Sequence, residues 1–145
     1  ELWGDEVLQP IARRLIRPSL QKAPAAMHGY QAGSKLPAMP LPVVKVVAPV
    51  AARIERRMNG ATDEAARGDL RAMPAHLDRI EAWMDEGVLG GDEPNAADLQ
   101  IAPTLRLLHT LGDVRPLMEG RRATTLAFKW LSPLPGSTPA GLLHA

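Results

Sequence analysis

Residues 90–108 read GGDEPNAADLQIAPTLRLL and contain the clearest helix start in the chain. Asn95 can serve as the N-cap, and Asp98 then falls at the third helical position, so each side chain can accept hydrogen bonds from free backbone N–H groups. Apolar residues follow at steps of three or four: Ile101, Leu105, Leu108 and Leu111. Because further apolar side chains surround them, the pattern predicts a central, largely buried helix that ends at Gly112 and bends near Pro103.

The strongest periodic signal lies between Thr62 and Glu86. Its apolar residues recur at steps of four and three: Ala66, Leu70, Met73, Leu77, Ile80 and Met84. This spacing predicts one long amphipathic helix that buries a single stripe. Thr62 is expected to be its N-cap and Gly87 its C-cap, and Pro74 is a position where the helix could kink.

Shorter helices are expected at about residues 4–16, 43–58, 113–119 and 122–130. Pro18 is expected to weaken any continuation of the first. The segment GSKLPAMPLP (33–42) should be an irregular connection, and VVKVV (43–47) is the best candidate for a strand, although it runs straight into a helical stretch. The sequence therefore predicts an all-α bundle of five to seven helices, with residues 1–131 as one domain and a Pro- and Gly-rich tail at 132–145.

Composition narrows the classes of function. The chain has 145 residues with 17 basic and 16 acidic side chains spread along it, which argues against nucleic acid or an anionic membrane as a partner. It has no cysteine, and hence no disulfide framework, thiolate metal site or cysteine nucleophile. No secretory signal or bilayer-spanning run is found, so a cytoplasmic protein is expected. Because the chain begins at Glu1 and enters a helix at once, we expect it to be a piece of a longer product.

Four stretches in this order resemble the C-terminal helical domain of the cytosolic, bacterial-type glutathione S-transferases: WGDEVLQPIARRL, HLDRIEAWMDEGVLGG, EPNAADLQIAPTLRLL and LGDVRPLMEGRRA. The resemblance covers nearly the whole chain. Its most specific element is the N-capping box that this family places at the start of its central helix, usually Ser or Thr followed three residues later by Asp. Asn95 and Asp98 match it, with Asn keeping the acceptor oxygen. The accompanying hydrophobic staple is weaker, since Pro94 would have to pack against Leu99.

The resemblance implies a division of labour between two domains. In that family a thioredoxin-like N-terminal half carries the Ser, Tyr or Cys that activates or bonds the glutathione sulfur. No catalytic residue is therefore expected in this chain, and it should be inactive alone. The enzyme would conjugate or reduce small electrophiles with glutathione as co-substrate and no tightly bound cofactor. The helical half would supply one wall of the site for a small hydrophobic electrophile. The full-length protein would be a homodimer.

Two alternatives stay open at this point. The first is a non-catalytic protein-interaction module, because the same helical domain is used in complexes that have no transferase activity. The second is an unrelated helical bundle, which would be favoured only if Asn95 and Asp98 did not cap a buried helix.

The candidate binding residues lie in the first quarter of the chain. Arg13 and Arg17 share a helix stripe with Gln9, and they could hold the thioredoxin-like domain by ion pairs or touch the glutathione carboxylates. A solvated arginine stripe is the alternative. By the resemblance, Met27 and Tyr30 fall in a segment that borders the apolar substrate, although a loosely packed loop would look the same in sequence.

Other reactive residue types show no functional pattern. The four histidines are scattered without metal spacing, so no metal site is expected: His28, His76, His109 and His144. Ser34 and Ser132 lack the surroundings of a hydrolase nucleophile. The acidic residues of the long helix are expected to form a solvated face with Arg79 rather than a catalytic dyad: Asp78, Glu81 and Asp85.

Overall fold

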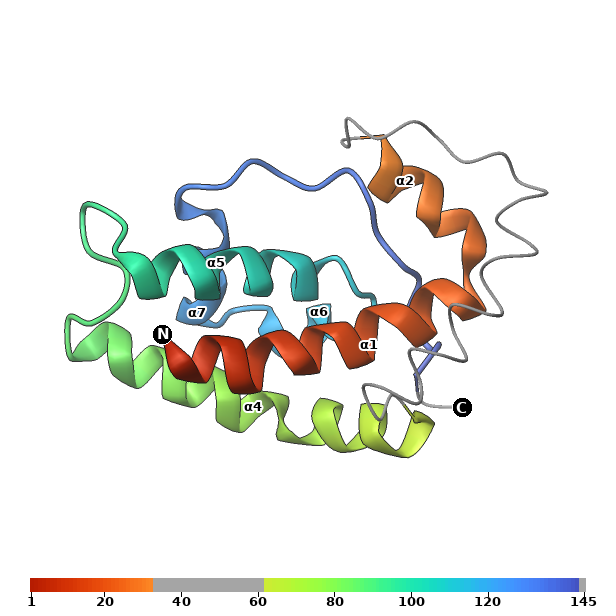
Figure 1. Cartoon of the computed structure of the whole chain (residues 1–145), viewed down its shortest axis with the longest axis horizontal. Helices are drawn as coiled ribbons and strands as arrows, with labels where there is room; N and C mark the ends of the chain where they lie inside the picture. The colour runs from red at the N-terminus through yellow and green to blue at the C-terminus, as the bar shows by residue number, and fades with distance from the viewer. Residues whose placement is uncertain (33–61, 144–145) are drawn as a thin grey trace.

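The computed structural model describes residues 1–32 and 62–143, and this part of the chain is helical (Figure 1). Its elements are the π-helical turn η1 (Gly4–Leu8), α1 (Gln9–Lys22), the 3-10 turn η2 (Pro24–Ala26), α2 (Met27–Gln31), α4 (Asp63–Asp85), α5 (Ala96–His109), α6 (Arg115–Met118) and α7 (Arg122–Lys129). The described ranges contain no strand beyond one isolated bridge between Leu111 and Thr138. The predicted all-α class is confirmed there. The expected helix at 43–58, the connection at 33–42 and the strand candidate at 43–47 lie outside the described residues.

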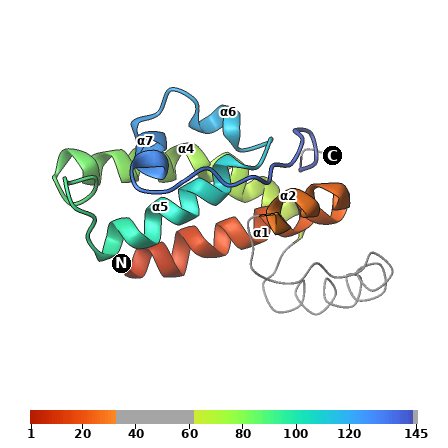
Figure 2. The ribbon, with the colours of Figure 1, turned by 90° about the horizontal axis from the view of Figure 1, so that it is seen from above.

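Helix α5 is the centre of the bundle. It contacts η1 and α1 on one side and α7 on the other, and Figure 2 shows it between these two neighbours. Its core residues Ile101, Leu105 and Leu108 are at most 2% exposed. Long helix α4 lies against α1 and α7 and buries five of the six residues of the predicted stripe, while the sixth, Met84, is half-buried. The five are Ala66, Leu70, Met73, Leu77 and Ile80. Together α4 and α5 contribute nine of the twenty-one buried residues of the apolar core in the described chain, and α1, α7 and the turns supply most of the rest.

The N-capping box predicted at α5 is present. Asn95 Oδ1 accepts hydrogen bonds from the N–H groups of Ala97 and Asp98 at 2.8 and 3.0 Å. In return, Asp98 Oδ2 accepts from the N–H of Asn95 at 3.1 Å. Asp98 is 0% exposed, and its second oxygen accepts from the N–H of Gly90 at 2.8 Å. The carboxylate therefore fixes the preceding turn as well as the helix start, and the condition that would favour an unrelated bundle is not met.

The turn before α5 has further attachments. Lys129 Nζ donates to the carbonyl oxygens of Gly90 and Gly91 at 2.8 and 2.6 Å, so α7 also holds this turn. Gly90 has a φ of +77°, a conformation that side chains rarely adopt. Leu99, which the staple would require, is 59% exposed, so it makes no buried contact at this helix start.

The first helix extends further than predicted. It passes through Pro18 and continues to Lys22 instead of ending near residue 16. Pro18 and Ser19 are buried against the core, and Ser19 Oγ donates to the Leu15 carbonyl at 2.8 Å. A proline removes only one backbone hydrogen bond at that position, and the burial of this face compensates for the loss.

A wider turn, η1, precedes α1 because of a second proline. Pro10 has no N–H, and its ring would clash with the carbonyl four residues earlier in a regular helix. The N–H of Gln9 instead reaches the carbonyl of Gly4, five residues back. A Cβ on Gly4 would lie 3.1 Å from Gln100 Oε1 and 3.6 Å from Ile101 Cγ1. Glycine at this position therefore lets η1 approach α5 closely.

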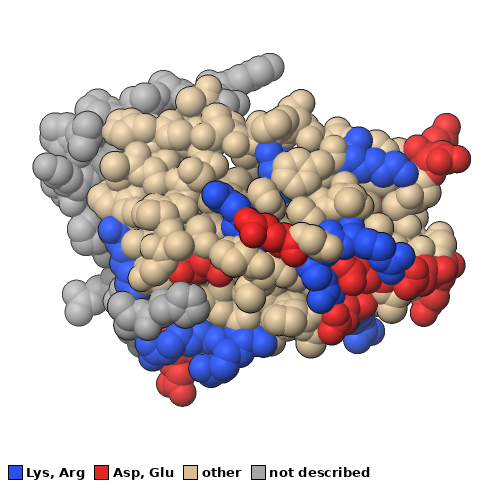
Figure 3. All heavy atoms as spheres, turned by 180° about the vertical axis from the view of Figure 1, so that it is seen from behind, with Lys and Arg blue, Asp and Glu red and all other residues tan. Residues whose placement is uncertain are grey.

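The acidic side chains of α4 face the start of α7: Asp78, Glu81 and Asp85. Arg121 contacts the first two, and Arg122 binds both oxygens of the third at 2.7 and 2.8 Å. Glu81 also accepts from the N–H of Ala123 at 3.1 Å, so α4 caps α7. The expected solvated face is present at Asp78 and Asp85, but among the described residues these acids pair with Arg121 and Arg122 instead of Arg79, because sequence spacing along one helix cannot reveal a neighbouring helix. In the rear view of Figure 3, acidic and basic side chains lie interspersed over one region.

Arg79 stacks on tryptophans instead. Its guanidinium carbon lies 4.9 Å from the ring centroid of Trp83 and 6.0 Å from that of Trp3. The two indole rings meet edge to face at 5.1 Å, and His76 lies 5.7 Å from Trp3. Burial lowers the pKa of His76. This cluster attaches the start of the chain to α4.

Residues 132–143 form no helix, yet they are anchored to the bundle. Asp113 accepts from the N–H groups of Gly141, Leu142 and Leu143 at 2.6, 3.0 and 3.2 Å. Leu143 is 1% exposed and belongs to the core. A Cβ on Gly112 would lie 2.4 Å from the backbone nitrogen of Ala140, so glycine is needed where the tail passes the turn after α5. Among the described helices, none combines the length and hydropathy needed to cross a bilayer.

Replacing Asp98 with Ala should lower the free energy of unfolding by about 2–4 kcal/mol, because it removes the cap and also leaves the N–H of Gly90 without its acceptor. Denaturant unfolding of the 145-residue chain measures the change. Asp92, exposed in the same turn, is the matched control, and Asp92→Ala should change stability by less than about 0.5 kcal/mol. Equal effects of the two substitutions would contradict this role of Asp98.

Candidate functional site

A groove of about 390 Å³ lies between the first half of α1, with η1, and the first half of α5. Its lining combines polar and apolar side chains: Asp5, Gln9, Ala12, Arg13, Leu99, Gln100, Pro103, Thr104 and Leu107. The two helices run side by side in the same direction in Figure 1, so residues of both contribute along the length of the groove. It contains one of the four predicted binding residues, Arg13.

A chain of side-chain hydrogen bonds runs along the α1 side of this groove. Gln9 Nε2 donates to Asp5 Oδ1 at 2.6 Å, and Arg13 Nη2 donates to Gln9 Oε1 at 2.9 Å. Gln100 Nε2 crosses from α5 to donate to Asp5 Oδ2 at 3.0 Å. The polar groups of η1, α1 and α5 are therefore held in fixed positions relative to one another.

Arg13 keeps its positive charge without a carboxylate partner in the described part of the chain. Its hydrogen-bond partner there is the neutral amide oxygen of Gln9, and the side chain is exposed. Its neighbour Arg14 has the opposite arrangement, since it binds both oxygens of Asp69 on α4 at 2.7 and 2.9 Å. The hydrogen bond to Asp69 raises the pKa of Arg14. Arg14 therefore fixes α1 to α4, whereas Arg13 is available to an anionic group from outside.

Arg17 lies one turn beyond Arg13 on the same stripe of α1 and is half-buried, but it does not line the groove. Met27 and Tyr30 lie on α2, which Figure 1 places at the far end of α1. Both are half-buried. The structure thus places the two arginines on one helix stripe and the two substrate-side candidates on a separate short helix.

Tyr30 is fastened to the end of α5. Its hydroxyl lies 2.6 Å from Thr110 Oγ1, which donates its own proton to the Leu107 carbonyl at 2.6 Å, so Tyr30 is the donor of the bond between them. A Cβ on Gly136 would come within 2.5 Å of the Tyr30 ring, which shows how closely the tail covers it. Burial raises the pKa of the Tyr30 hydroxyl, and the charge of Arg115 opposes this.

The groove presents apolar surface beside a positive charge. Leu99 and Pro103 are exposed apolar surface beside the positive charge of Arg13. Thr104 is the residue of the groove lining that carries a hydroxyl group. This hydroxyl donates to the Gln100 carbonyl at 2.9 Å and does not face a general base, as a nucleophile would. In residues 1–32 and 62–143, no three His, Cys, Asp or Glu side chains converge as metal ligands would.

The sequence predicted the stripe that Arg13 shares with Gln9, but the contributions of Asp5 and Gln100 were missed. Asp5, Gln9 and Arg13 recur every four residues, a spacing that predicts neighbours on a helix face. That signal was present in the sequence. The contribution of Gln100 was not, because it depends on how closely η1 packs against α5.

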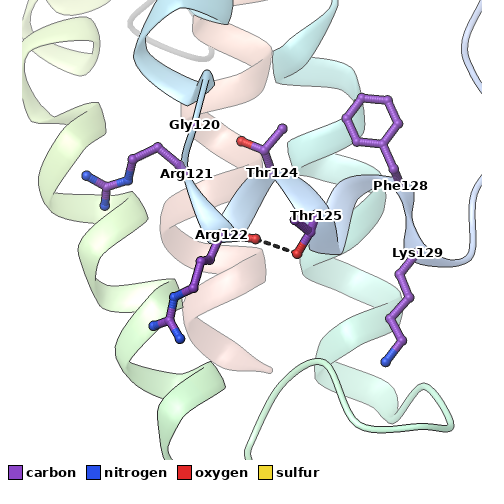
Figure 4. Close-up of a pocket in the computed structure, with 7 residues that line it drawn as sticks. All are labelled: Gly120, Arg121, Arg122, Thr124, Thr125, Phe128 and Lys129. Atoms are coloured by element: carbon purple, nitrogen blue, oxygen red, sulfur yellow. Dashed lines mark hydrogen bonds between the residues drawn. The ribbon is translucent and has the colours of Figure 1, made fainter.

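A second hollow, of about 640 Å³, lies over α7 (Figure 4). Its lining is drawn there: Gly120, Arg121, Arg122, Thr124, Thr125, Phe128 and Lys129. Arg121 and Arg122 point towards α4, where they meet acidic partners, and Lys129 points to the turn before α5. Thr125 Oγ1 donates to the Arg122 carbonyl at 2.7 Å. The polar groups of this hollow are thus engaged within the chain.

Comparison with protein-family models, curated proteins and solved structures finds no match to this chain.

Tyr30 is the single tyrosine of the chain, so its ionisation can be followed by the absorbance of tyrosinate. The folded chain should titrate above pH 10, the ordinary value for the phenol, because burial disfavours the charged form. Its contribution to stability is therefore complete below the pKa of the unfolded state and is lost as pH rises through the pKa of the folded state. Identical midpoints for the folded chain and the chain unfolded in denaturant would contradict the packing of Tyr30.

Proposed function

We propose that this chain is the C-terminal helical half of a glutathione S-transferase, acting as a cytoplasmic homodimer once joined to a thioredoxin-like domain. The observation that carries the proposal is the Asn95–Asp98 capping box at the start of the buried central helix α5. The proposal is supported by the position of this box before a buried helix, which is where that family would be expected to use it. The groove between α1 and α5, with exposed apolar residues beside it, is a surface on which a second domain could pack.

In the proposed enzyme the two halves have different tasks. The thioredoxin-like half lowers the pKa of the glutathione thiol, so that thiolate is present at neutral pH. The thiolate sulfur then forms a bond to the carbon of an electrophile, which releases its leaving group or takes up a proton. Arg13 is placed to attract a carboxylate of glutathione, because its charge is not neutralised by a neighbour in the described chain. The helical half holds a small hydrophobic electrophile within reach.

Met27 and Tyr30 have a supporting part in this proposal. The hydroxyl of Tyr30 is bonded to Thr110, and Gly136 covers its ring. Tyr30 would therefore help to shape the surface of α2 that faces the electrophile, and its hydroxyl would not contact the electrophile. Arg17, one turn further along α1, would add a second positive charge on the same stripe. A non-catalytic interaction module would use the same exposed face of α1 and α5 to hold a protein partner.

The two functions are separated by measuring glutathione-dependent turnover of a generic aromatic electrophile. The 145-residue chain is compared with the product of the same gene that includes any residues encoded before Glu1. We expect turnover only in the longer protein, because the thiol-activating group belongs to the other domain. Turnover in neither would favour the interaction module, and turnover in the short chain would overturn the proposed division.

Arg13→Ala in the longer protein should raise KM for glutathione about tenfold and leave KM for the electrophile within about twofold, because a charge-assisted contact to a carboxylate is lost. Steady-state kinetics with each substrate varied in turn measure both constants. Arg71→Ala is the control, since Arg71 is exposed on α4 away from the groove. An unchanged KM for glutathione would show that Arg13 belongs to a solvated stripe.

A further inference from the structure

Arg106 is a charged side chain that the proposed function does not use. It lies on α5 at the side that faces α7, and it is only 5% exposed. Its Nε lies 3.5 Å from the carbonyl of Ser132, a long hydrogen bond. Neither terminal nitrogen has a hydrogen-bonding partner among residues 1–32 and 62–143, and no carboxylate in that part pairs with it. Burial lowers the pKa of Arg106.

A buried arginine is normally paired with an acid, because taking its charge out of water is costly. Here the compensation comes from a ring. The guanidinium carbon of Arg106 lies 4.2 Å from the centroid of Phe128, whose own side chain is 41% exposed. Stacking of this kind uses the flat face of the guanidinium and leaves its edge, with the terminal N–H groups, free to donate.

His109 also packs its imidazole ring against Phe128. It lies three residues after Arg106 on α5, and its ring meets Phe128 edge to face at 5.0 Å. Burial is the largest cause that lowers the pKa of His109, followed by the charges of Arg115 and Arg106, while Glu119 opposes them. Arg115 donates to the backbone carbonyls of His109 and Thr110 at 3.2 and 3.5 Å. The surroundings of Arg106 therefore carry an excess of positive charge.

We propose that the edge of Arg106, with Phe128 and His109 beside it, binds the carboxylate of a small aromatic acid. The two terminal N–H groups form a planar fork that matches the two oxygens of a carboxylate. The exposed part of Phe128 gives apolar surface for the body of the ligand. Arg106, Phe128 and His109 are not among the lining residues of the α1–α5 groove, so this site is separate from the one that Arg13 serves.

The chain offers an unambiguous probe, because Phe128 is its single phenylalanine and Tyr30 its single tyrosine. Benzoate is titrated into the 145-residue chain while the ring resonances of both residues and of His109 are followed by NMR. Saturable shifts at Phe128 and His109 with none at Tyr30 support the site. Equal shifts with benzyl alcohol, which has the ring but no carboxylate, overturn it, and so does an absence of shifts at Phe128.

Three variants test the fork. Arg106→Lys keeps the charge but loses the planar pair of donors, and it should weaken benzoate binding at least about fivefold; Arg106→Gln should weaken it at least about tenfold. The variant Arg71→Gln, at an exposed position of α4, should bind benzoate as tightly as the parent chain does. Undiminished binding in Arg106→Lys would reduce the site to a point charge and contradict the proposal.

Two further comparisons cover the remaining outcomes. Inorganic phosphate is titrated in the same way, and tighter binding of phosphate than of benzoate at Phe128 would overturn the assignment to carboxylates. If Arg106→Gln fails to fold, judged by circular dichroism, the shifts of Phe128 in the unsubstituted chain and the result for Arg106→Lys still decide. If benzoate shifts Phe128 in neither of these two chains, the proposal is contradicted, and Arg106 would serve only to offset the dipole at the end of α5.

Discussion

The buried carboxylate of Asp98 holds two parts of the chain at once, and the arrangement of the bundle depends on it. One oxygen accepts from the N–H of Asn95 at the start of α5, and the other accepts from the N–H of Gly90 in the turn that follows α4. A cap alone would fix where α5 begins. The added bond to Gly90 also fixes how α5 leaves α4, because the intervening turn can no longer move independently. Lys129 secures the same turn from α7.

Once α5 is placed, its two sides carry different chemistry. The side towards η1 and α1 forms a groove in which a hydrogen-bonded series of side chains leads to the exposed charge of Arg13. The side towards α7 holds Arg106, whose charge is covered by Phe128 instead of a carboxylate. Both arginines lack an acidic partner in the described chain, and both are held by a rigid helix. Arg13 on α1 and Arg106 on α5 thus lie on two separate surfaces beside or on the central helix.

Features that depend on local spacing could be predicted from the sequence. The stripe of α4, the cap at Thr62 and the capping box of α5 all follow from residue types at fixed offsets, and each is present. Features that depend on a neighbouring helix could not. The continuation of α1 through Pro18 is stabilised by burial, and the acidic residues of α4 find their partners on α7, about forty positions later in the sequence. The stacking of Arg106 on Phe128 is of the same kind, because nothing in either segment indicates the other.

Asp98 joins the turn and the helix into one unit, and hydrogen exchange tests this directly. The amide protons of Gly90 and Asn95 should exchange as slowly as that of Leu105 in the middle of α5, because their bonds to a 0% exposed carboxylate would break only when the bundle unfolds. Exchange of Gly90 and Asn95 at the rate of the exposed amide of Asp92 would contradict the account, because it would mean that the turn opens while α5 stays intact.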